Sequence, residues 1–406
     1  MSLLTNLRSS RFRFTQNICV IKKNSFDNIR GYKVLAIETS CDDACVTLLD
    51  RYSPTEVPKV IQERKVTLNS ISAGGVVPTD AANHNRKNIS KLVNQMIIEN
   101  NWNTPNTKPD LICATRGPGM VGSLAGGYQL ACGLSIAWQI PLVGVNHMLG
   151  HLLIVRMKSN GNEPKYPFLS LLVSGGHTMC VLSHSLIRHE ILVDTVDIAA
   201  GDALDKCGRE LGITGNMIGK EVEILLNQHK KEWNQPVDIM VKEPMLNQWD
   251  RINSLQYSFA SFNSQVKNTL KKFYNSEIPK DDKIRVRLLF KFQQTIFQHM
   301  ISKIKLAIKS RGLKVENFIC SGGVSSNLYL REMITDQLST EAIKNFYFPE
   351  PRLCTDNATM IGWAGIELYE KGYTTDIGTT VIRKWPITEL LELEGWIKDG
   401  KPLDIL

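Results

Sequence analysis

The sequence predicts an α/β fold made of two similar halves. Short apolar runs of strand length alternate with longer helical segments, which is typical of α/β proteins. The order of strand, hairpin, strand and helix occurs twice, which we interpret as an internal structural duplication without evident sequence identity. The chain has 406 residues, of which 43% are hydrophobic and 22% charged. That length fits two or three domains, and that composition is typical of a soluble globular protein.

The first half begins with three expected strands. Residues 33–38 and 44–50 are apolar runs separated by a short gap, which predicts a hairpin, and a third strand lies near residues 65–68. A helix is expected over residues 79–100. The other elements expected here are a strand at 110–114, a buried helix at 124–138 and a strand at 142–145.

The second half repeats this order. A strand over residues 168–173 turns at a Gly-Gly pair into a strand over residues 178–182, and a third strand is expected near residues 191–193. The later elements expected are helices from about 197 and at 285–310, a strand at 317–320, a helix at 326–337, a strand at 346–348 and a helix at 358–370. We also expect a final helix and tail over residues 385–406.

We divide the chain into a leader and two lobes. Residues 1–30 contain six Lys or Arg and one Asp, and so carry five of the eight net positive charges. A start rich in Arg and poor in acids is the pattern of a mitochondrial transit peptide, the alternative being a basic tail. Residues 31–146 form lobe I. Residues 147–357 form lobe II with a helical insertion at about 215–310, and residues 358–406 pack back on lobe I.

Two composition features bear on the compartment. The nine cysteines are odd in number and include no CxxC pair, which indicates a reducing compartment and argues against a disulfide framework. Residues 117–155 contain no charged side chain, but Pro and Gly residues interrupt the apolar stretch. A spanning helix needs about 20 apolar residues in a row, so we expect no membrane insertion.

Two histidines carry the strongest chemical signal. His147 and His151 are four residues apart, so on a helix both imidazoles lie on one face and can share a divalent metal ion. Asp356, just before a helix, is a candidate third ligand. The alternative is a pair of helix histidines with ordinary hydrogen bonds. A zinc protease would need Glu directly after the first His, and Met148 stands there instead.

Three Gly-rich turns, at 116–119, 174–178 and 321–327, could approach a phosphate closely. Two of them follow apolar strands in corresponding halves, which favours a nucleotide between the lobes over plain hairpins. Neither of these two turns matches GxxxxGK[ST] or GxGxxG, so they do not predict a P-loop or a Rossmann site.

Charged residues flank these turns. Asp42 and Asp43 follow the first strand, and Asp205 could accept hydrogen bonds from ribose hydroxyls, although capping or a solvated surface is the commoner role of Asp. Lys206 and Arg209, and the polar run at 84–87, could meet a nucleic-acid backbone or simply be solvated.

Taken together, these motifs resemble the tRNA threonylcarbamoyl-adenosine transferase family (the TsaD family), and in particular its mitochondrial branch in fungi. The resemblance covers roughly residues 33–370 and rests on an ordered set of motifs. They are IETSCDD at 37–43, NHMLGH at 146–151, VSGGHT at 173–178, SGGVSSN at 321–327 and CTDN at 354–357.

The resemblance implies an actin-like ATPase (ASKHA) fold, with two duplicated RNase H-like lobes around a nucleotide and metal cleft. It implies transfer of threonylcarbamoyl from threonylcarbamoyl-AMP to N6 of adenosine 37 in mitochondrial tRNAs that read ANN codons, with release of AMP. It further implies a mitochondrial matrix location, a threonylcarbamoyl-AMP synthase as functional partner, and a homodimer.

The resemblance also assigns roles to residues. One divalent metal ion, with zinc or iron favoured over magnesium or manganese, would be held by His147, His151 and Asp356. Asp42 or Asp43 would accept a proton from the amine. The adenylate, or another ATP- or AMP-type nucleotide, would be held by Ser174, Gly175, Gly176, His177, Asp205, Gly219, Glu223 and Asn327.

One segment departs from the family pattern. The family usually has Pro-Gly-Gly after the Asp205 helix, whereas residues 214–219 read TGNMIG with one extra residue, which puts Gly219 in doubt. The rival readings are a metallopeptidase (glycoprotease), a small-molecule kinase of the same fold, and a nucleotide-gated binding protein in genome maintenance.

Overall fold

The computed structural model describes residues 31–403 apart from 105, 159–162, 234, 236–238 and 247–250. The predicted transit peptide at residues 1–30 lies outside the described residues. Across the described part of the chain, no helix combines the length and apolarity needed to cross a membrane.

The first half forms a five-stranded sheet in the order β3-β2-β1-β4-β5. Its strands are β1 (Tyr32–Glu38), β2 (Asp43–Arg51), β3 (Lys59–Thr67), β4 (Leu111–Gly117) and β5 (Leu142–Asn146). β1 pairs antiparallel with β2 and parallel with β4. β3 is longer than the strand predicted near residues 65–68. It is an edge strand in which most residues are exposed and several are charged, so it contains no apolar run that would predict its full length.

The second half forms a six-stranded sheet in the order β11-β10-β6-β7-β8-β9. Its strands are β6 (Phe168–Val173), β7 (Thr178–Ser183), β8 (His189–Thr195), β9 (Gln256–Tyr257), β10 (Asn317–Ser321) and β11 (Asn345–Tyr347). β6 pairs antiparallel with β7 and parallel with β10.

The two sheets share one topology. Read from the antiparallel edge, the first runs third, second, first, fourth, fifth, and the second sheet repeats this order as β8-β7-β6-β10-β11. The parallel and antiparallel pairings correspond strand for strand. The predicted α/β fold and its structural duplication are confirmed, and both sheets have the strand order expected for the two RNase H-like lobes of an actin-like ATPase fold.

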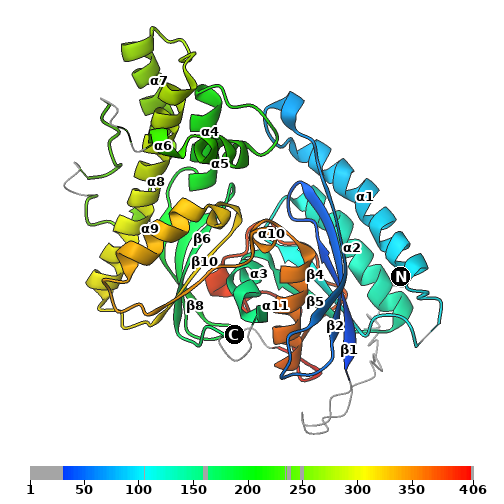
Figure 1. Ribbon diagram of the computed structural model, residues 1–406. Helices are drawn as coiled ribbons and strands as arrows, with labels where there is room; N and C mark the ends of the chain where they lie inside the picture. The colour runs from blue at the N-terminus through cyan, green and yellow to red at the C-terminus, as the bar shows by residue number, and fades with distance from the viewer. Residues whose placement is uncertain are drawn as a thin grey trace, which may run out of the picture.

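Helices cover both faces of the first sheet. α1 (Pro78–Glu99) and α2 (Val121–Trp138) pack on one face, and α11 (Ala358–Glu370) packs across β1, β2, β4 and β5 on the other. α3 (His147–Leu153), α10 (Pro351–Cys354) and α11 lie between the two sheets (Figure 1). One apolar core joins α3 and α11 to strands of both sheets.

The second sheet carries its own helical layer. The long helix α8 packs against α4, α5, α6 and α9, and α4 also contacts α7 (Figure 1). These helices are α4 (Ala200–Glu210), α5 (Ile218–Gln228), α6 (Lys230–Trp233), α7 (Ala260–Tyr274), α8 (Asp282–Arg311) and α9 (Leu328–Leu338).

The C-terminal segment corrects one expectation. The final helix expected over residues 385–406 is wrong, because the described part holds only a 3₁₀ turn at Ile387–Glu389 and strands β13 (Trp396–Lys398) and β14 (Lys401–Pro402), which join β12 (Tyr373–Thr375) in a small sheet. Gly395 and Gly400 adopt positive φ angles, which stop a helix there.

Candidate functional site

Helix α3 presents both histidines from a capped start. The side-chain oxygen of Asn146, at the end of β5, accepts hydrogen bonds from the backbone N–H groups of Met148 (2.9 Å) and Leu149 (3.3 Å). This is an N-cap, which satisfies N–H groups that the helix itself leaves unpaired. The Asn146 amide nitrogen donates to the carbonyl of Trp385 (3.1 Å), so the C-terminal segment holds the cap in place.

A glycine lets α3 approach α11 closely. A Cβ atom at Gly150 would lie 3.1 Å from side-chain carbons of both Met360 and Ile361. That contact is tighter than a side chain normally tolerates, so Gly150 permits the distance between the histidine helix and the helix that follows Asp356.

Asp356 sits between α10 and α11. Asn357 caps α11 by accepting from the N–H of Met360 (2.8 Å) and donates from its amide to Thr355 O (2.7 Å). The amino group of Lys65, on β3, donates to the backbone carbonyl of Asp356 (2.9 Å). The loop that carries the carboxylate is therefore anchored at its helix and at the first sheet.

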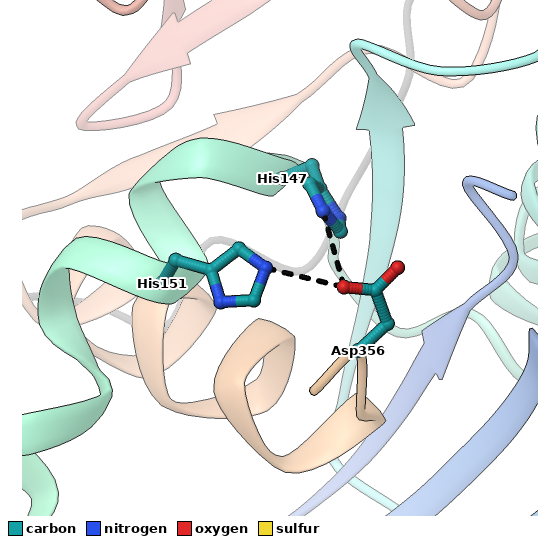
Figure 2. A group of neighbouring side chains, drawn as sticks. All are labelled: His147, His151 and Asp356. Atoms are coloured by element: carbon teal, nitrogen blue, oxygen red, sulfur yellow. Dashed lines mark hydrogen bonds and ion pairs between the residues drawn. The ribbon is translucent and has the colours of Figure 1, made fainter. Parts of the chain in front are cut away.

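The three predicted ligands converge. Figure 2 shows both imidazoles turned toward the Asp356 carboxylate, with His151 Nε2 3.2 Å and His147 Nε2 3.5 Å from Asp356 Oδ1. One ligand atom from each residue lies within 4.8 Å of the others, and both histidines are buried. Two imidazole nitrogens and one carboxylate oxygen make a donor set that fits zinc, iron or manganese and leaves coordination positions open.

Glu38 is a further functional candidate, to which the sequence motifs assign no role. It ends β1 and is fully buried, and its Oε2 lies 3.2 Å from His147 Nδ1, on the ring nitrogen that faces away from Asp356. Its Oε1 accepts from the N–H of Ser40 (2.5 Å), and its Oε2 also accepts from the Thr115 hydroxyl. A carboxylate on the second nitrogen is the usual device that orients a ligating imidazole. The sequence feature that could have identified Glu38 is its place as an acidic residue at the end of a buried, apolar strand.

The charges of these residues stabilise one another. Burial lowers the pKa of His147, but Asp356 and Glu38 outweigh burial and raise it to about 9. Burial raises the pKa of Asp356, but His147 and His151 outweigh burial and hold it below its usual range. The site thus gathers positive charge beside fixed carboxylates, and a divalent cation can take the place of that charge.

The turn between β6 and β7 reaches the same place. Ser174 Oγ accepts from the N–H groups of Gly176 (3.2 Å) and His177 (3.0 Å). The ring of His177 lies 6.5 Å from that of His147, centroid to centroid. Burial, with His147 and His151, lowers the pKa of His177 to about 4, so it is neutral near pH 7. Space is open where Gly175 and Gly176 would carry side chains.

The other predicted nucleotide residues form two pairs. Asp205 Oδ1, on α4, accepts from the N–H of Gly219 (3.0 Å), so Gly219 does lie beside the predicted ribose acid. Burial raises the pKa of Asp205. Glu223 accepts from the N–H of Leu328 (3.4 Å), next to Asn327, whose side chain caps α9 by accepting from Leu330. The structure shows no contact between these two pairs and the histidines.

The two candidate acids differ in their surroundings. Asp43 is buried and accepts from the Lys65 amino group (2.6 Å) and the Thr67 hydroxyl (2.5 Å). Burial raises its pKa to about 6 in spite of these bonds. Asp42 is partly exposed, and its backbone carbonyl accepts from the N–H of Leu68 (3.0 Å).

Only part of the polar run at residues 84–87 is exposed to a partner. Asn85 is buried and donates to the carbonyls of Thr39 (3.4 Å) and Cys41 (2.7 Å), and His84 bonds to the carbonyl of Val66 (3.0 Å). Two residues of the run therefore anchor α1. Arg86 and Lys87 are exposed beside them, and Arg209 is exposed on α4.

Comparison with known proteins gives one consistent family. The family model described as "TsaD: tRNA N6-adenosine threonylcarbamoyltransferase" matches residues 60–363. The chain is 35% identical over 409 residues to "tRNA N6-adenosine threonylcarbamoyltransferase, mitochondrial" of Schizosaccharomyces pombe, covering 98% of this chain and 97% of the relative. It is 34% identical over 363 residues to "tRNA N6-adenosine threonylcarbamoyltransferase" of Wigglesworthia glossinidia brevipalpis, covering 89% and 99%.

Solved structures resemble the chain more distantly. HypF of T. kodakarensis has a TM-score of 0.49 at 12% identity, covering 84% of this chain and 48% of HypF. Component A of the Acidaminococcus fermentans (R)-2-hydroxyglutaryl-CoA dehydratase has a TM-score of 0.45 at 13% identity, covering 83% and 97%. Likenesses this distant say nothing about the reaction.

Proposed function

Because the chain belongs to the TsaD family of tRNA N6-adenosine threonylcarbamoyltransferases, we propose that it transfers a threonylcarbamoyl group to N6 of a tRNA adenosine. The acyl donor is threonylcarbamoyl-AMP, and the acceptor is adenosine 37 of tRNAs that read ANN codons. The observation that carries the proposal is the convergence of His147, His151 and Asp356 beside the Ser174 turn. This arrangement brings a candidate metal site close to a turn that could bind the phosphate of the donor.

The reaction needs alignment more than activation. The adenosine N6 forms a bond to the carbamoyl carbon, the bond from that carbon to the phosphate oxygen breaks, and AMP leaves with the electron pair. The amine loses one proton to a base. The donor is already an acyl phosphate, so the residues must hold a weak amine against the carbonyl and stabilise the developing charge.

We assign the metal to His147, His151 and Asp356. When bound, the ion supplies Lewis acidity that polarises an oxygen of the donor. Glu38 orients the His147 ring, and Lys65 holds the Asp356 loop through its carbonyl. The donor set favours zinc or iron, with manganese or magnesium as alternatives.

We assign the nucleotide to the second half. The Ser174 turn, which leaves open space at Gly175 and Gly176, and the Gly-rich turn at 321–327 before α9 are suited to phosphate oxygens. Asp205 is suited to the ribose hydroxyls. Residues that complete this proposed site are Gly175, Gly176, His177, Gly219, Glu223 and Asn327.

We assign the proton acceptor to Asp42 or Asp43, with Asp42 better placed to meet substrate. Asp43 already accepts from Lys65 and Thr67, whereas Asp42 is partly exposed. The raised pKa of Asp43, about 6, keeps it a candidate, because a base works best when its pKa is near the working pH.

The proposed partners follow from charge and exposure. Arg86 and Lys87 on the first half and Arg209 on the second offer exposed cations to the tRNA backbone. α2 carries no charged residue, and Val121 and Ile136 on it are about half exposed, which suits a second copy of the chain. Light scattering that shows an active monomer would contradict the homodimer.

The proposed functional partner is a threonylcarbamoyl-AMP synthase. It supplies the acyl donor and does not need to form a complex with this chain.

We place the protein in the mitochondrion, in the matrix, because the matching S. pombe relative is named as mitochondrial and residues 1–30 have the composition of a transit peptide. A fluorescent fusion of the full chain should co-localise with a matrix marker, and a fusion that lacks residues 1–30 should not.

Three rival functions predict different results. A metallopeptidase would cleave a glycoprotein, but Met148 replaces the Glu that such a site uses as its base. A small-molecule kinase would phosphorylate a sugar or acetate at the expense of ATP and would not need the histidine pair. A nucleotide-gated binding protein would keep its function in His147→Ala.

The test is a transfer assay with the metal-loaded protein, unmodified tRNA, and donor made by a synthase from threonine, bicarbonate and ATP. Nucleoside mass spectrometry should find N6-threonylcarbamoyladenosine, and it should be absent when Asp356→Asn replaces the wild type. A folded, metal-loaded wild type that yields no modified nucleoside contradicts the proposal.

A further inference from the structure

One asparagine joins the two halves of the molecule. The side-chain oxygen of Asn216 accepts hydrogen bonds from both the backbone N–H (3.0 Å) and the hydroxyl (3.1 Å) of Ser70, and its amide nitrogen donates to the carbonyl of Leu68 (3.3 Å). Asn216 lies between α4 and α5, on the second half, whereas Ser70 follows β3 of the first sheet. In Figure 1 this green loop reaches across to the blue segment that precedes α1.

Each end of this contact is tied to a residue of the proposed site. On the first half, the N–H of Leu68 donates to the backbone carbonyl of Asp42 (3.0 Å). On the second half, Gly219, three residues after Asn216, donates its N–H to Asp205 Oδ1 (3.0 Å). A short covalent and hydrogen-bonded path therefore runs from the proposed proton acceptor to the proposed ribose acid through one side chain.

The segment that holds Asn216 offers one side chain suited to this contact. Residues 214–219 read TGNMIG, and Asn216 is the only amide among them. A side-chain amide both accepts and donates hydrogen bonds, as the contacts to Ser70 and Leu68 require. Gly215 has a φ of 142°, which lets the backbone turn Asn216 toward the first half.

We propose that Asn216 is a clasp between the two lobes, which sets their separation while its hydrogen bonds are formed and so keeps the nucleotide in its site. The clasp rests on the proposed function, because it acts on the same nucleotide site. Asn216 is exposed, so its hydrogen bonds compete with water and can open and close reversibly. The closed clasp positions the ribose acid relative to Asp42, and the open clasp releases AMP. Asn216 is a positioning residue and touches no reacting atom.

Two measurements on the full chain test the clasp. The first is amide hydrogen exchange of Ser70, whose N–H is bonded to Asn216. The second is the dissociation rate of AMP, followed by stopped flow. The variants are Asn216→Ala, which removes all three bonds, and Asn216→Asp, which keeps an acceptor for Ser70 but no donor for Leu68. Thr214→Ala, at an exposed neighbour in the same loop, is the matched control.

Asn216→Ala should speed both Ser70 exchange and AMP dissociation about tenfold, the effect expected from losing a small set of exposed hydrogen bonds. Asn216→Asp should fall between Asn216→Ala and the wild type, and Thr214→Ala should match the wild type. Unchanged Ser70 exchange in Asn216→Ala overturns the clasp. Faster exchange with unchanged AMP dissociation also overturns it, because the contact is then merely local.

The exchange measurement separates this idea from the proposed function. If wild-type protein binds no AMP, the nucleotide site fails. In that case amide exchange still decides the clasp. Equal rates in Asn216→Ala and the wild type overturn it, and so does faster exchange confined to Ser70. Faster exchange in Asn216→Ala that extends to the Leu68 amide on the first half and the Gly219 amide on the second supports it.

Discussion

Glu38 Oε2 lies 3.2 Å from His147 Nδ1, and this contact leaves the other ring nitrogen, Nε2, facing Asp356. The two carboxylates therefore hold one imidazole from opposite sides. Because Nδ1 faces this acceptor, it keeps its proton, and Nε2 is the nitrogen that can give up its proton to bind a cation. The orientation of a ligand thus depends on a residue 109 positions away in the chain.

Glu38→Gln should weaken metal binding about 10- to 100-fold, the usual effect of removing a carboxylate behind a ligating histidine. Isothermal titration with zinc, checked by elemental analysis, measures the affinity. Glu370→Gln is the control, because Glu370 is paired with Arg51 instead. Equal zinc affinity in Glu38→Gln and the wild type would show that Glu38 does not orient the ligand.

Asn146→Ala should both destabilise the fold and weaken metal binding, because Asn146 caps the helix that carries both histidines. The loss of an N-cap costs about 1 kcal/mol of unfolding free energy. Asp281→Ala, which removes the N-cap of α8, should cost a similar amount and leave metal binding unchanged. Chemical denaturation and zinc titration of both variants separate the two effects. Similar zinc affinities for the two variants would refute the link between the cap and the ligands.

The buried imidazole of His189 should make the protein sensitive to acid. His189 accepts from the Ser183 hydroxyl at Nδ1 (2.9 Å) and donates from Nε2 to the carbonyl of Leu186 (3.0 Å), and burial lowers its pKa to about 4. The unfolded chain binds a proton at a pKa of about 6.5, so it gains protons before the folded chain does.

The stability that His189 contributes is therefore complete above about pH 6.5 and falls as the pH drops toward 4, by about 3 kcal/mol in all. Denaturation at a series of pH values should show this loss in the wild type and a flatter profile in His189→Gln. His184→Gln, at a partly exposed neighbour, is the control. Identical pH profiles for His189→Gln and the wild type would remove His189 as the source.

Arg86→Ala should weaken tRNA binding by a similar factor for different tRNA sequences, because a contact to phosphate carries no sequence information. It should also reduce the slope of log affinity against log salt by about one unit. Filter binding at several salt concentrations gives both quantities. Lys401→Ala, exposed in the small C-terminal sheet, is the charge-matched control. A salt slope equal to that of the wild type would exclude Arg86 from the tRNA surface.

Local patterns predicted much of the fold. The β6 strand and α11 match their expected ranges, because both are apolar segments bounded by polar or turn residues. The C-terminal segment was mispredicted as a helix, since its buried Trp385 and Trp396 pack through turns and short strands that leave no period in the sequence. The duplication could be predicted because the order of strands and helices along the chain is the same in both halves and can be read from the sequence.

Some contacts of the candidate site could also be predicted from local sequence patterns, and others could not. The pairing of His147 and His151 was predictable, because their spacing places both on one helical face. Glu38 and Asn216 were not given roles, because their contacts join segments more than 100 residues apart and no local spacing encodes them. In the run at 84–87, the local sequence also did not show that Asn85 turns inward to hold the loop at Cys41.

The most direct measurement is nucleoside mass spectrometry of tRNA after reaction with purified threonylcarbamoyl-AMP and the metal-loaded protein. The account predicts one N6-threonylcarbamoyladenosine per AMP released, and neither product above background with Asp356→Asn. Omitting the synthase from this assay leaves the chain as the only catalyst. AMP release without modified adenosine, or no product from folded and metal-loaded protein, would contradict the account.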